Sequence, residues 1–168
     1  MSSRSLRLLS LCFILLCTAG CDQVTKHLAR KQLSRDGSAI VAGGFLQFIL
    51  AENPGAFLSL GASLPQTART VLTVCVGVAL ALLLAHIVRT PTMRMTLVLG
   101  LTLICAGGIS NLLDRLLRDG LVTDFMILRL GPLRTGIFNF ADFAIVMGTL
   151  LVAFSWFRQQ RMSTQSPI

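Results

Sequence analysis

Residues 136–157 read Gly-Ile-Phe-Asn-Phe-Ala-Asp-Phe-Ala-Ile-Val-Met-Gly-Thr-Leu-Leu-Val-Ala-Phe-Ser-Trp-Phe, an apolar run that only Asp142 interrupts with a charge. The run is close to the roughly 20 residues that a helix needs to cross a bilayer. A carboxylate at membrane depth is costly, so it is more often functional than incidental. The alternative is an interfacial aspartate that caps the N-terminus of a helix. The stretch predicts a membrane span with a candidate site at its beginning.

Three further runs extend the same interpretation. The chain between Arg69 and Arg89 carries no charged residue apart from His86, and a charge-free run of similar length lies between Arg94 and Asp114. The first run, from residue 8 to residue 20, is short and spans only if flanking residues extend it or the bilayer thins. We predict a single membrane domain over residues 1–168 with spans at 6–22, 69–89, 95–114 and 137–157. The intervening segments 23–68 and 115–136 are then expected on the outer side.

Composition supports a membrane protein. Hydrophobic residues make up 54% of the chain and charged residues 13%, whereas a soluble domain has about 45–50% and about 25%. The net charge of +8 comes from basic residues that flank the apolar runs, so no nucleic-acid partner is expected. The five cysteines lack the paired spacing of a zinc site, and neither a metal nor a cofactor is predicted.

The charge distribution predicts the topology. If the N-terminus is cytoplasmic, the inner segments contain basic residues and no acid: Arg4, Arg7, Arg89, Arg94, Arg158 and Arg161. All the acids then fall on the outer side or at its boundary: Asp22, Asp36, Glu52, Asp114, Asp119, Asp124 and Asp142. This distribution favours cytoplasmic N- and C-termini, although acids weigh little in insertion.

Two outer segments have strand signals. Residues 45–50 form a short apolar stretch after Gly43-Gly44, and residues 121–138 are typical of a hairpin with Gly131-Pro132 at its turn. We therefore predict an α-helical membrane fold of four transmembrane helices, with a small β-sheet on the outer membrane face.

Polar residues gather at the outer ends of the predicted helices, at spacings that place pairs on one helix face. The pairs are Asp22 with Lys26, Asn111 with Arg115, and Asn139 with Asp142. Asp124 lies in the second outer segment and, taken alone, would be an ordinary solvated acid. Together, Asp124 and Asp142 could share a proton, since two neighbouring carboxylates do not both ionise easily. Such a pair can activate water while it protonates a carbonyl, without a metal, serine or cysteine.

Five ordered motifs make the chain resemble the lipoprotein signal peptidases (signal peptidase II), aspartic proteases of the bacterial inner membrane. They are Asp22-Gln23-Val24-Thr25-Lys26, Asn53-Pro54-Gly55-Ala56, Asn111-Leu112-Leu113-Asp114-Arg115, Val122-Thr123-Asp124-Phe125 and Phe138-Asn139-Phe140-Ala141-Asp142. The resemblance implies four transmembrane helices with a small periplasmic sheet. It also implies cleavage of diacylglyceryl-modified prolipoproteins just before the lipidated cysteine, in contact with membrane lipid and at the periplasmic face of the inner membrane.

The resemblance also implies residue roles. Asp124 and Asp142 match the catalytic pair, and the supporting or substrate-binding positions are Asp22, Lys26, Asn53, Gly55, Asn111, Arg115 and Asn139. Three features depart from the usual pattern: Ser110 replaces a common glycine, Pro54 is unusual, and Phe57-Leu58 follows the second motif. We expect these departures to affect the substrate-facing loop rather than the aspartates.

Three alternatives remain open at this stage. Thr18-Ala19-Gly20-Cys21 resembles a lipobox, in which case the chain would itself be a lipoprotein modified at Cys21. A small proton-coupled transporter would need Asp142 as a relay and would make Asp124 incidental. An inactive relative that binds lipoproteins without cutting them would keep the same motifs.

Overall fold

The computed structural model describes residues 3–33, 38–55 and 61–164. Asp36, Ala56 and the Phe57-Leu58 departure lie outside the described residues, as does the side chain of Arg4.

Within these residues, four helices are long and apolar enough to cross a membrane. They are α1 (Ser3–Gln32), α2 (Gln66–Arg89), α3 (Met95–Leu117) and α4 (Phe140–Thr164). Large apolar side chains remain exposed along them, including Phe13, Leu16, Leu82 and Phe154. Exposed apolar surface of this kind suits contact with lipid, because lipid tails solvate it as well as a protein core would. The predicted membrane α-helical fold is confirmed.

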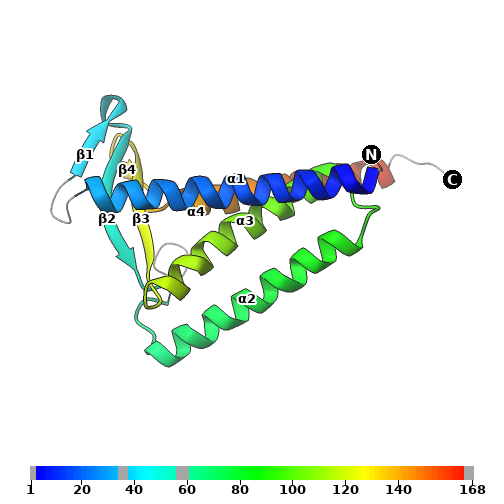
Figure 1. Ribbon diagram of the computed structural model, residues 1–168. Coiled ribbons are helices and arrows are strands. Elements are labelled where there is room, and N and C mark those ends of the chain that lie inside the picture. Colours follow the sequence, from blue (N-terminus) through cyan, green and yellow to red (C-terminus); the bar gives the residue numbers. More distant parts are fainter. Residues whose placement is uncertain (1–2, 34–37, 56–60, 165–168) are drawn as a thin grey trace.

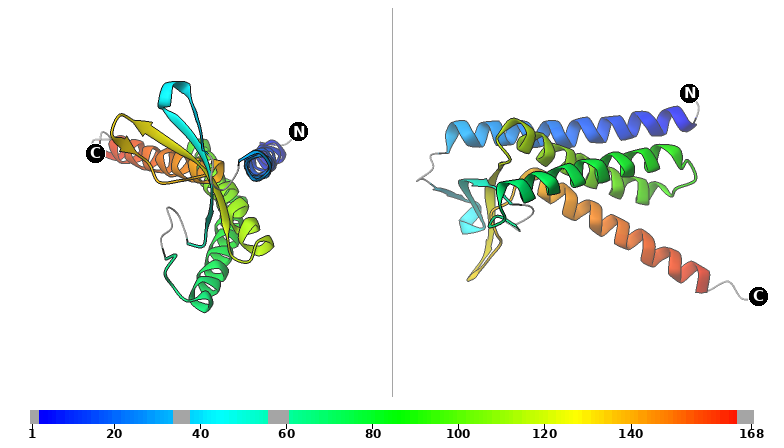
Figure 2. Two further views of the ribbon diagram at one scale, coloured as in Figure 1. Left: turned by 90° about the vertical axis from the view of Figure 1, so that its left-hand side faces the viewer. Right: turned by 90° about the horizontal axis from the view of Figure 1, so that it is seen from below.

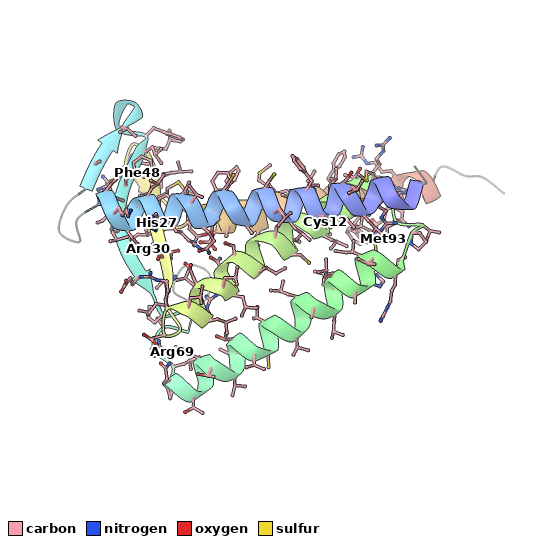
Figure 3. The ribbon with its side chains drawn as sticks, viewed as in Figure 1. Cys12, His27, Arg30, Phe48, Arg69 and Met93 are labelled. Atoms are coloured by element: carbon pink, nitrogen blue, oxygen red, sulfur yellow. The ribbon has the colours of Figure 1, made fainter. Side chains whose placement is uncertain are left out.

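Helix α1 extends beyond the membrane span predicted at residues 6–22. It continues from the expected end of the span at residue 22 to Gln32. Its last turns carry polar side chains that find partners on other elements: Lys26 bonds Asn111 of α3, and Arg30 bonds Thr123 of the sheet. Figure 3 shows Arg30 and His27 at this end of α1, beside the sheet. The helix therefore extends because distant partners satisfy its polar residues.

The sheet is antiparallel with the order β1-β2-β3-β4. Its strands are β1 (Ser38–Val41), β2 (Leu46–Asn53), β3 (Val122–Leu130) and the very short β4 (Leu133–Arg134). Gly131 has φ 57°, so the residue at the turn adopts the left-handed conformation that glycine accepts without strain. The predicted hairpin with its turn at Gly131-Pro132 is confirmed.

The register of β2 against β3 brings two candidate site residues together. Asn53 pairs with Val122 and Ala51 pairs with Asp124, after an irregularity between Phe48 and Ala51. Asn53 and Asp124 are therefore diagonal neighbours on the same face of the sheet, close enough for side-chain contact.

Helices α3 and α4 pack closely through glycines. A Cβ atom at Gly100 would lie 2.8 Å from the carbonyl oxygen of Gly148, and one at Gly148 would lie 2.5 Å from that of Gly100. A Cβ at Gly107 would collide with the backbone of Ala141, at the start of α4. Small residues allow this close backbone approach, which drives helix association in lipid. The glycines thus fix the start of α4 against α3, where the candidate site lies.

The sheet lies at one end of the helices (Figure 1). Figure 1 shows the sheet at the left, with the first and last described residues and the α2–α3 turn at the opposite end. Helix α2 packs mainly on α3 and leans away from α1 and α4 toward the sheet end. In Figure 2, α4 diverges from the other helices toward its C-terminal end.

Candidate active site

The two predicted catalytic aspartates are both buried at the junction of the helices and the sheet. Asp124, on β3, is 3% exposed, and Asp142, in the first turn of α4, is 6% exposed. A buried carboxylate requires hydrogen-bond donors or opposite charges to offset its lost hydration. The neighbouring asparagines supply these donors.

Asn139 caps helix α4 and bonds both aspartates. Its side-chain oxygen accepts the N–H of Asp142 at 2.9 Å, and its own N–H donates to the Asp142 carboxylate at 3.3 Å. This reciprocal arrangement is a capping box. The side-chain amide of Asn139 also donates to Oδ1 of Asp124 at 2.6 Å. Asp142 can therefore be both a capping residue and a functional one, because the capping hydrogen bonds hold its carboxylate in the site.

Each carboxylate oxygen of the pair accepts a hydrogen bond from a backbone or side-chain amide. Asn53 donates to Oδ2 of Asp124 at 2.9 Å, and Asn111 donates to Oδ1 of Asp142 at 2.9 Å. The side-chain oxygen of Asn111 accepts Nζ of Lys26 at 2.8 Å and the amide of Asn139 at 3.2 Å. Three asparagines thus fix the orientation of both aspartates.

Beneath the asparagines lies a buried ionic cluster. Nζ of Lys26 is 2.7 Å from Asp22 and 3.2 Å from Asp114, and these three side chains are at most 2% exposed. Asp22 also accepts the N–H of Ala141 at 2.8 Å, at the N-terminus of α4. A carboxylate is stabilised at that end of a helix by the free N–H groups and the helix dipole. Asp22, paired with Lys26, therefore holds the N-terminus of α4 in place. Neither residue contacts the aspartate pair directly.

Ser110 belongs to this cluster, so the expectation that its departure would affect a substrate-facing loop is wrong. Its side chain is fully buried, and its hydroxyl donates to Asp22 at 2.7 Å. The hydroxyl also accepts from Gln23 at 3.0 Å. Because Ser110 lies one helical turn before Asp114, it faces α1 rather than the loop after β2.

Other polar residues in the cluster were not among the predicted site residues. Gln23 donates to Asp114 at 3.1 Å, and Asp114 accepts the N–H of Thr123 at 3.0 Å, which ties α3 to β3. The spacing of Ser110 and Asp114 on one helix face was the available signal. Their partners lie far away in the chain, so spacing alone could not identify them.

Arg115 and Gly55 contact each other at the end of β2. Arg115 donates from Nη2 to the carbonyl oxygen of Gly55 at 2.7 Å and from Nη1 to that of Asn111 at 3.2 Å. The N–H of Gly55 donates to the side chain of Asn53 at 2.9 Å. Arg69 of α2, absent from the predicted site, reaches the carbonyl oxygen of Pro54 at 3.4 Å. The two arginines thus hold the chain after β2 beside the aspartates.

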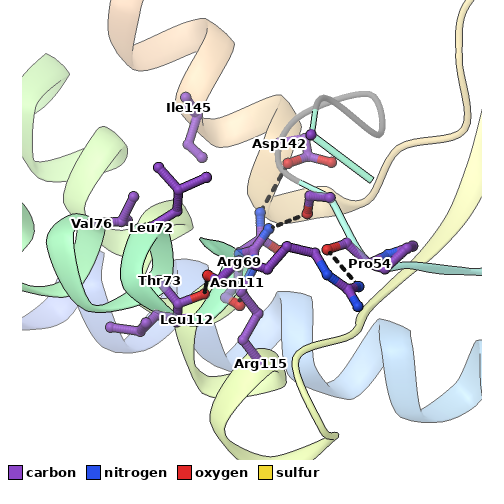
Figure 4. A pocket seen from close by; sticks show the side chains of 12 residues that line it. Pro54, Arg69, Leu72, Thr73, Val76, Asn111, Leu112, Arg115, Asp142 and Ile145 are labelled. Carbon is purple, nitrogen blue, oxygen red and sulfur yellow. Dashed lines mark hydrogen bonds between the residues drawn. The ribbon is translucent and has the colours of Figure 1, made fainter. Parts of the chain in front are cut away.

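A cleft of ≈ 180 Å³ opens beside these residues (Figure 4). Its polar wall includes Asn111, Arg115 and Asp142, while an apolar wall comes from α2, α3 and α4. The apolar residues are Leu72, Val76, Leu112 and Ile145. Asp142 therefore meets the cleft directly. Asp124 lies behind it, held by Asn53 and Asn139.

The surroundings of Asp124 favour the protonated form of its carboxyl group. Burial raises the pKa of Asp124 to about 6, the negative charge of Asp142 adds to the rise, and the hydrogen bonds from Asn53 and Asn139 oppose it. Asp124 therefore holds a proton at a pH where an exposed aspartate would be ionised.

No group of three histidine, cysteine, aspartate or glutamate side chains is placed to hold a metal ion in the part of the chain that the structure describes. That the site works without a metal ion or a cofactor stays a prediction.

Fold and site together define a polytopic membrane protein with a buried carboxylate pair beside a cleft, an arrangement suited to acid–base hydrolysis. Residues 14–158 match the family model described as Signal peptidase (SPase) II. The chain is 37% identical over 131 residues to the lipoprotein signal peptidase of Moorella thermoacetica, covering 78% of this chain and 81% of that protein. It is 30% identical over 167 residues to that of Sulfurihydrogenibium sp., covering 98% and 99%.

Solved structures agree in fold. One, titled as a bacterial membrane enzyme solved by the in meso method at 2.3 Å resolution, superposes with a TM-score of 0.80 at 23% identity, covering 95% of this chain and 94% of that one. A second bacterial membrane enzyme, solved at 1.9 Å resolution, superposes with a TM-score of 0.74, and the match covers 88% of this chain and 92% of that one. The chain belongs to the signal peptidase II family and is a membrane protease, as the five motifs predicted.

Proposed function

We propose that this protease cuts diacylglyceryl-modified prolipoproteins just before the lipidated cysteine, with Asp124 and Asp142 as its catalytic pair. The observation that carries the proposal is Asn139, which bonds both carboxylates at the wall of the cleft. The apolar wall formed by Leu72, Val76, Leu112 and Ile145 supports a substrate with an acyl chain.

In the proposed mechanism, Asp142 is the base and Asp124 the acid. Asp142 lines the cleft at the N-terminus of α4, where the helix dipole favours a negative charge. It takes a proton from water as the water oxygen attacks the scissile carbonyl carbon. Asp124, whose pKa is raised to about 6, gives its proton to the carbonyl oxygen.

The tetrahedral intermediate then breaks down with the proton movements reversed. Asp142 passes its proton to the leaving nitrogen of the cysteine, and the bond between that nitrogen and the carbonyl carbon breaks. Asp124 recovers a proton from a hydroxyl of the intermediate, so both residues return to their starting states. Asn53, Asn111 and Asn139 keep the carboxylates aligned through the cycle.

The proposed orientation has both termini in the cytoplasm and the sheet on the periplasmic membrane face. It is supported by the distribution of acids, since those of the described residues belong to the sheet end, whereas the charged residues described at the opposite end are arginines (Figure 1). Reporter fusions after Arg89 should behave as cytoplasmic and fusions near Asp119 as periplasmic. Fusions of the opposite behaviour would contradict this orientation.

The lipobox alternative at Cys21 is disfavoured by the contacts of α1. The matched family region begins at residue 14, before Cys21, and α1 passes through Cys21 without a break. Cleavage there would remove Leu11 from the core that it forms with Ile87 and Val98. It would also remove the bond from Arg7 to the carbonyl oxygen of Ile87.

The test is cleavage by purified protein of one precursor prepared in two forms, with and without the diacylglyceryl group. We expect cleavage of the lipidated form alone, with mass spectrometry placing the new N-terminus at the modified cysteine. Equal cleavage of the two forms, or cleavage at another peptide bond, would contradict the proposed substrate.

A further inference from the structure

A second cleft, of ≈ 320 Å³, lies at the end of the molecule opposite the sheet. It is lined by Arg94, Thr96, Phe154, Ser155 and Arg158, from the beginning of α3 and the last turns of α4. Beyond the close contact of Gly100 with Gly148, the two helices separate, and α4 diverges in Figure 2. The cleft shares no lining residue with the candidate active site.

Its charge is positive and uncompensated. Among the residues that the structure describes, the guanidinium groups of Arg94 and Arg158 have no ion-pair or hydrogen-bond partner. The described acids all belong to the sheet end: Asp22, Glu52, Asp114, Asp119, Asp124 and Asp142. Two guanidinium groups on one cleft therefore favour an anion, and their planar donors match a phosphate.

Ser155 adds a donor that no protein group uses. Its side chain is 6% exposed, and no hydrogen bond from its hydroxyl is found in the described part of the chain. Thr149, on the same helix, instead donates to the carbonyl oxygen of Ile145, four residues earlier. Helix α3 also begins at this cleft without a side-chain cap, so its first N–H groups face the same region.

Apolar side chains lie next to the two arginines of the cleft, which favours a lipid as its ligand over a soluble anion. Phe154 lines the cleft and is 57% exposed, and the exposed ring of Phe157 follows three residues later on the same side of α4. Trp156, in the same helical turn, is also exposed and packs edge-on against Phe157. Tryptophan is enriched where a membrane protein meets the headgroup layer. A phosphate bound by the arginines would therefore lie at headgroup depth, with apolar rings next to it.

We propose that this cleft binds the phosphate of an anionic phospholipid. Arg94 and Arg158 pair with the phosphate oxygens, the Ser155 hydroxyl donates to one of them, and an acyl chain packs along Phe154. Basic pockets between helices on the cytoplasmic side are suited to such headgroups.

The test is native mass spectrometry of the purified protein in neutral detergent, titrated with phosphatidylglycerol or with phosphatidylcholine of the same acyl chains. We expect one preferentially bound phosphatidylglycerol. Arg94→Gln and Arg158→Gln should each weaken it about fivefold, and the double variant should weaken it roughly 20-fold. Ser155→Ala should weaken it about threefold. The matched control is Arg161→Gln, which removes an exposed charge on the same helix outside the cleft.

Monodisperse elution of each variant shows that it is folded. An Arg161→Gln protein that loses as much affinity as Arg158→Gln would reduce the effect to general surface charge and overturn the proposal. Unchanged binding in the double variant would overturn it as well. Inorganic phosphate at low millimolar concentration should not displace the lipid, and displacement would show that the cleft takes a free phosphate instead.

Discussion

The side-chain oxygen of Asn139 accepts the N–H of Asp142 at 2.9 Å, while the same side chain donates to Asp124 at 2.6 Å. One residue therefore begins helix α4 and links the two carboxylates. The stability of the helix start and the geometry of the site depend on different atoms of this asparagine, so substitution can separate them.

The first prediction separates these two roles. Asn139→Ala removes both the cap and the donor to Asp124, and we expect the free energy of unfolding to fall by about 2–4 kcal/mol together with a large loss of activity. Asn139→Ser keeps a capping oxygen but loses the amide that reaches Asp124. Since both variants lose that donor to a buried carboxylate, Asn139→Ser should also be less stable than the native protein by about 1–2 kcal/mol, but about 1 kcal/mol more stable than Asn139→Ala, and it should be at least about tenfold less active than the native protein. A Ser variant with native activity would show that the link to Asp124 is unimportant.

The second prediction concerns pH. As pH rises through the pKa of Asp124, about 6, the acid loses its proton and kcat/KM of the free enzyme should fall. The hydrogen bond from Asn53 favours the ionised form, so Asn53→Ala should raise the pKa and move this fall to higher pH. Glu52→Gln, a neighbouring change without that bond, is the control. A shift to lower pH in Asn53→Ala would contradict the assignment of Asp124 as the acid.

The third prediction concerns Arg115, whose two terminal nitrogens bond the carbonyl oxygens of Gly55 and Asn111. A lysine keeps the charge but cannot reproduce this planar pair of donors. We expect Arg115→Lys to lower kcat/KM about tenfold or more. Arg118→Lys is the matched control, because the pair of Arg118 with Glu52 is partly exposed and worth little. If both substitutions lower kcat/KM by the same small factor, the paired hydrogen bonds of Arg115 have no special role in cleavage.

The fourth prediction concerns Ser110, whose hydroxyl bonds Asp22 inside the ionic cluster. Ser110→Ala should lower the free energy of unfolding by about 1–2 kcal/mol, because a buried carboxylate loses a donor. Ser110→Gly should cost about 1 kcal/mol more, from helix propensity. Cleavage should stay within about twofold in both, since Ser110 does not contact the aspartate pair. A changed substrate preference with unchanged stability would instead support the expectation from the sequence that position 110 affects the substrate-facing loop.

The sequence predicted the fold well where local patterns decide it. Two long apolar runs, one between Arg69 and Arg89 and one between Arg94 and Asp114, identified α2 and α3, and Gly131-Pro132 identified the hairpin turn. How far α1 continues past the predicted span could not be predicted, because the polar residues at its end bond partners 85 to 93 residues away. No local pattern contains such partners.

The residues of the predicted site lie together in the structure, but their arrangement and the additional partners Gln23, Asp114 and Arg69 could not be predicted. Helical spacing correctly joined Asp22 with Lys26 and Asn139 with Asp142. It gave no sign that Asn53 would meet Asp124, which depends on the register of β2 and β3 and the irregularity between Phe48 and Ala51. The catalytic roles of these residues stay predictions.

The most direct test of the proposed pair is the cleavage rate of Asp124→Asn, Asp142→Asn and the double variant on a lipidated precursor. Asparagine keeps the size of the side chain but neither ionises nor transfers a proton, so each single variant should lose nearly all activity. The double variant should be hardly worse than either, because the two residues act as one unit. All three should still bind the precursor. An Asp124→Asn protein that cleaves at close to the native rate would contradict the shared-proton mechanism.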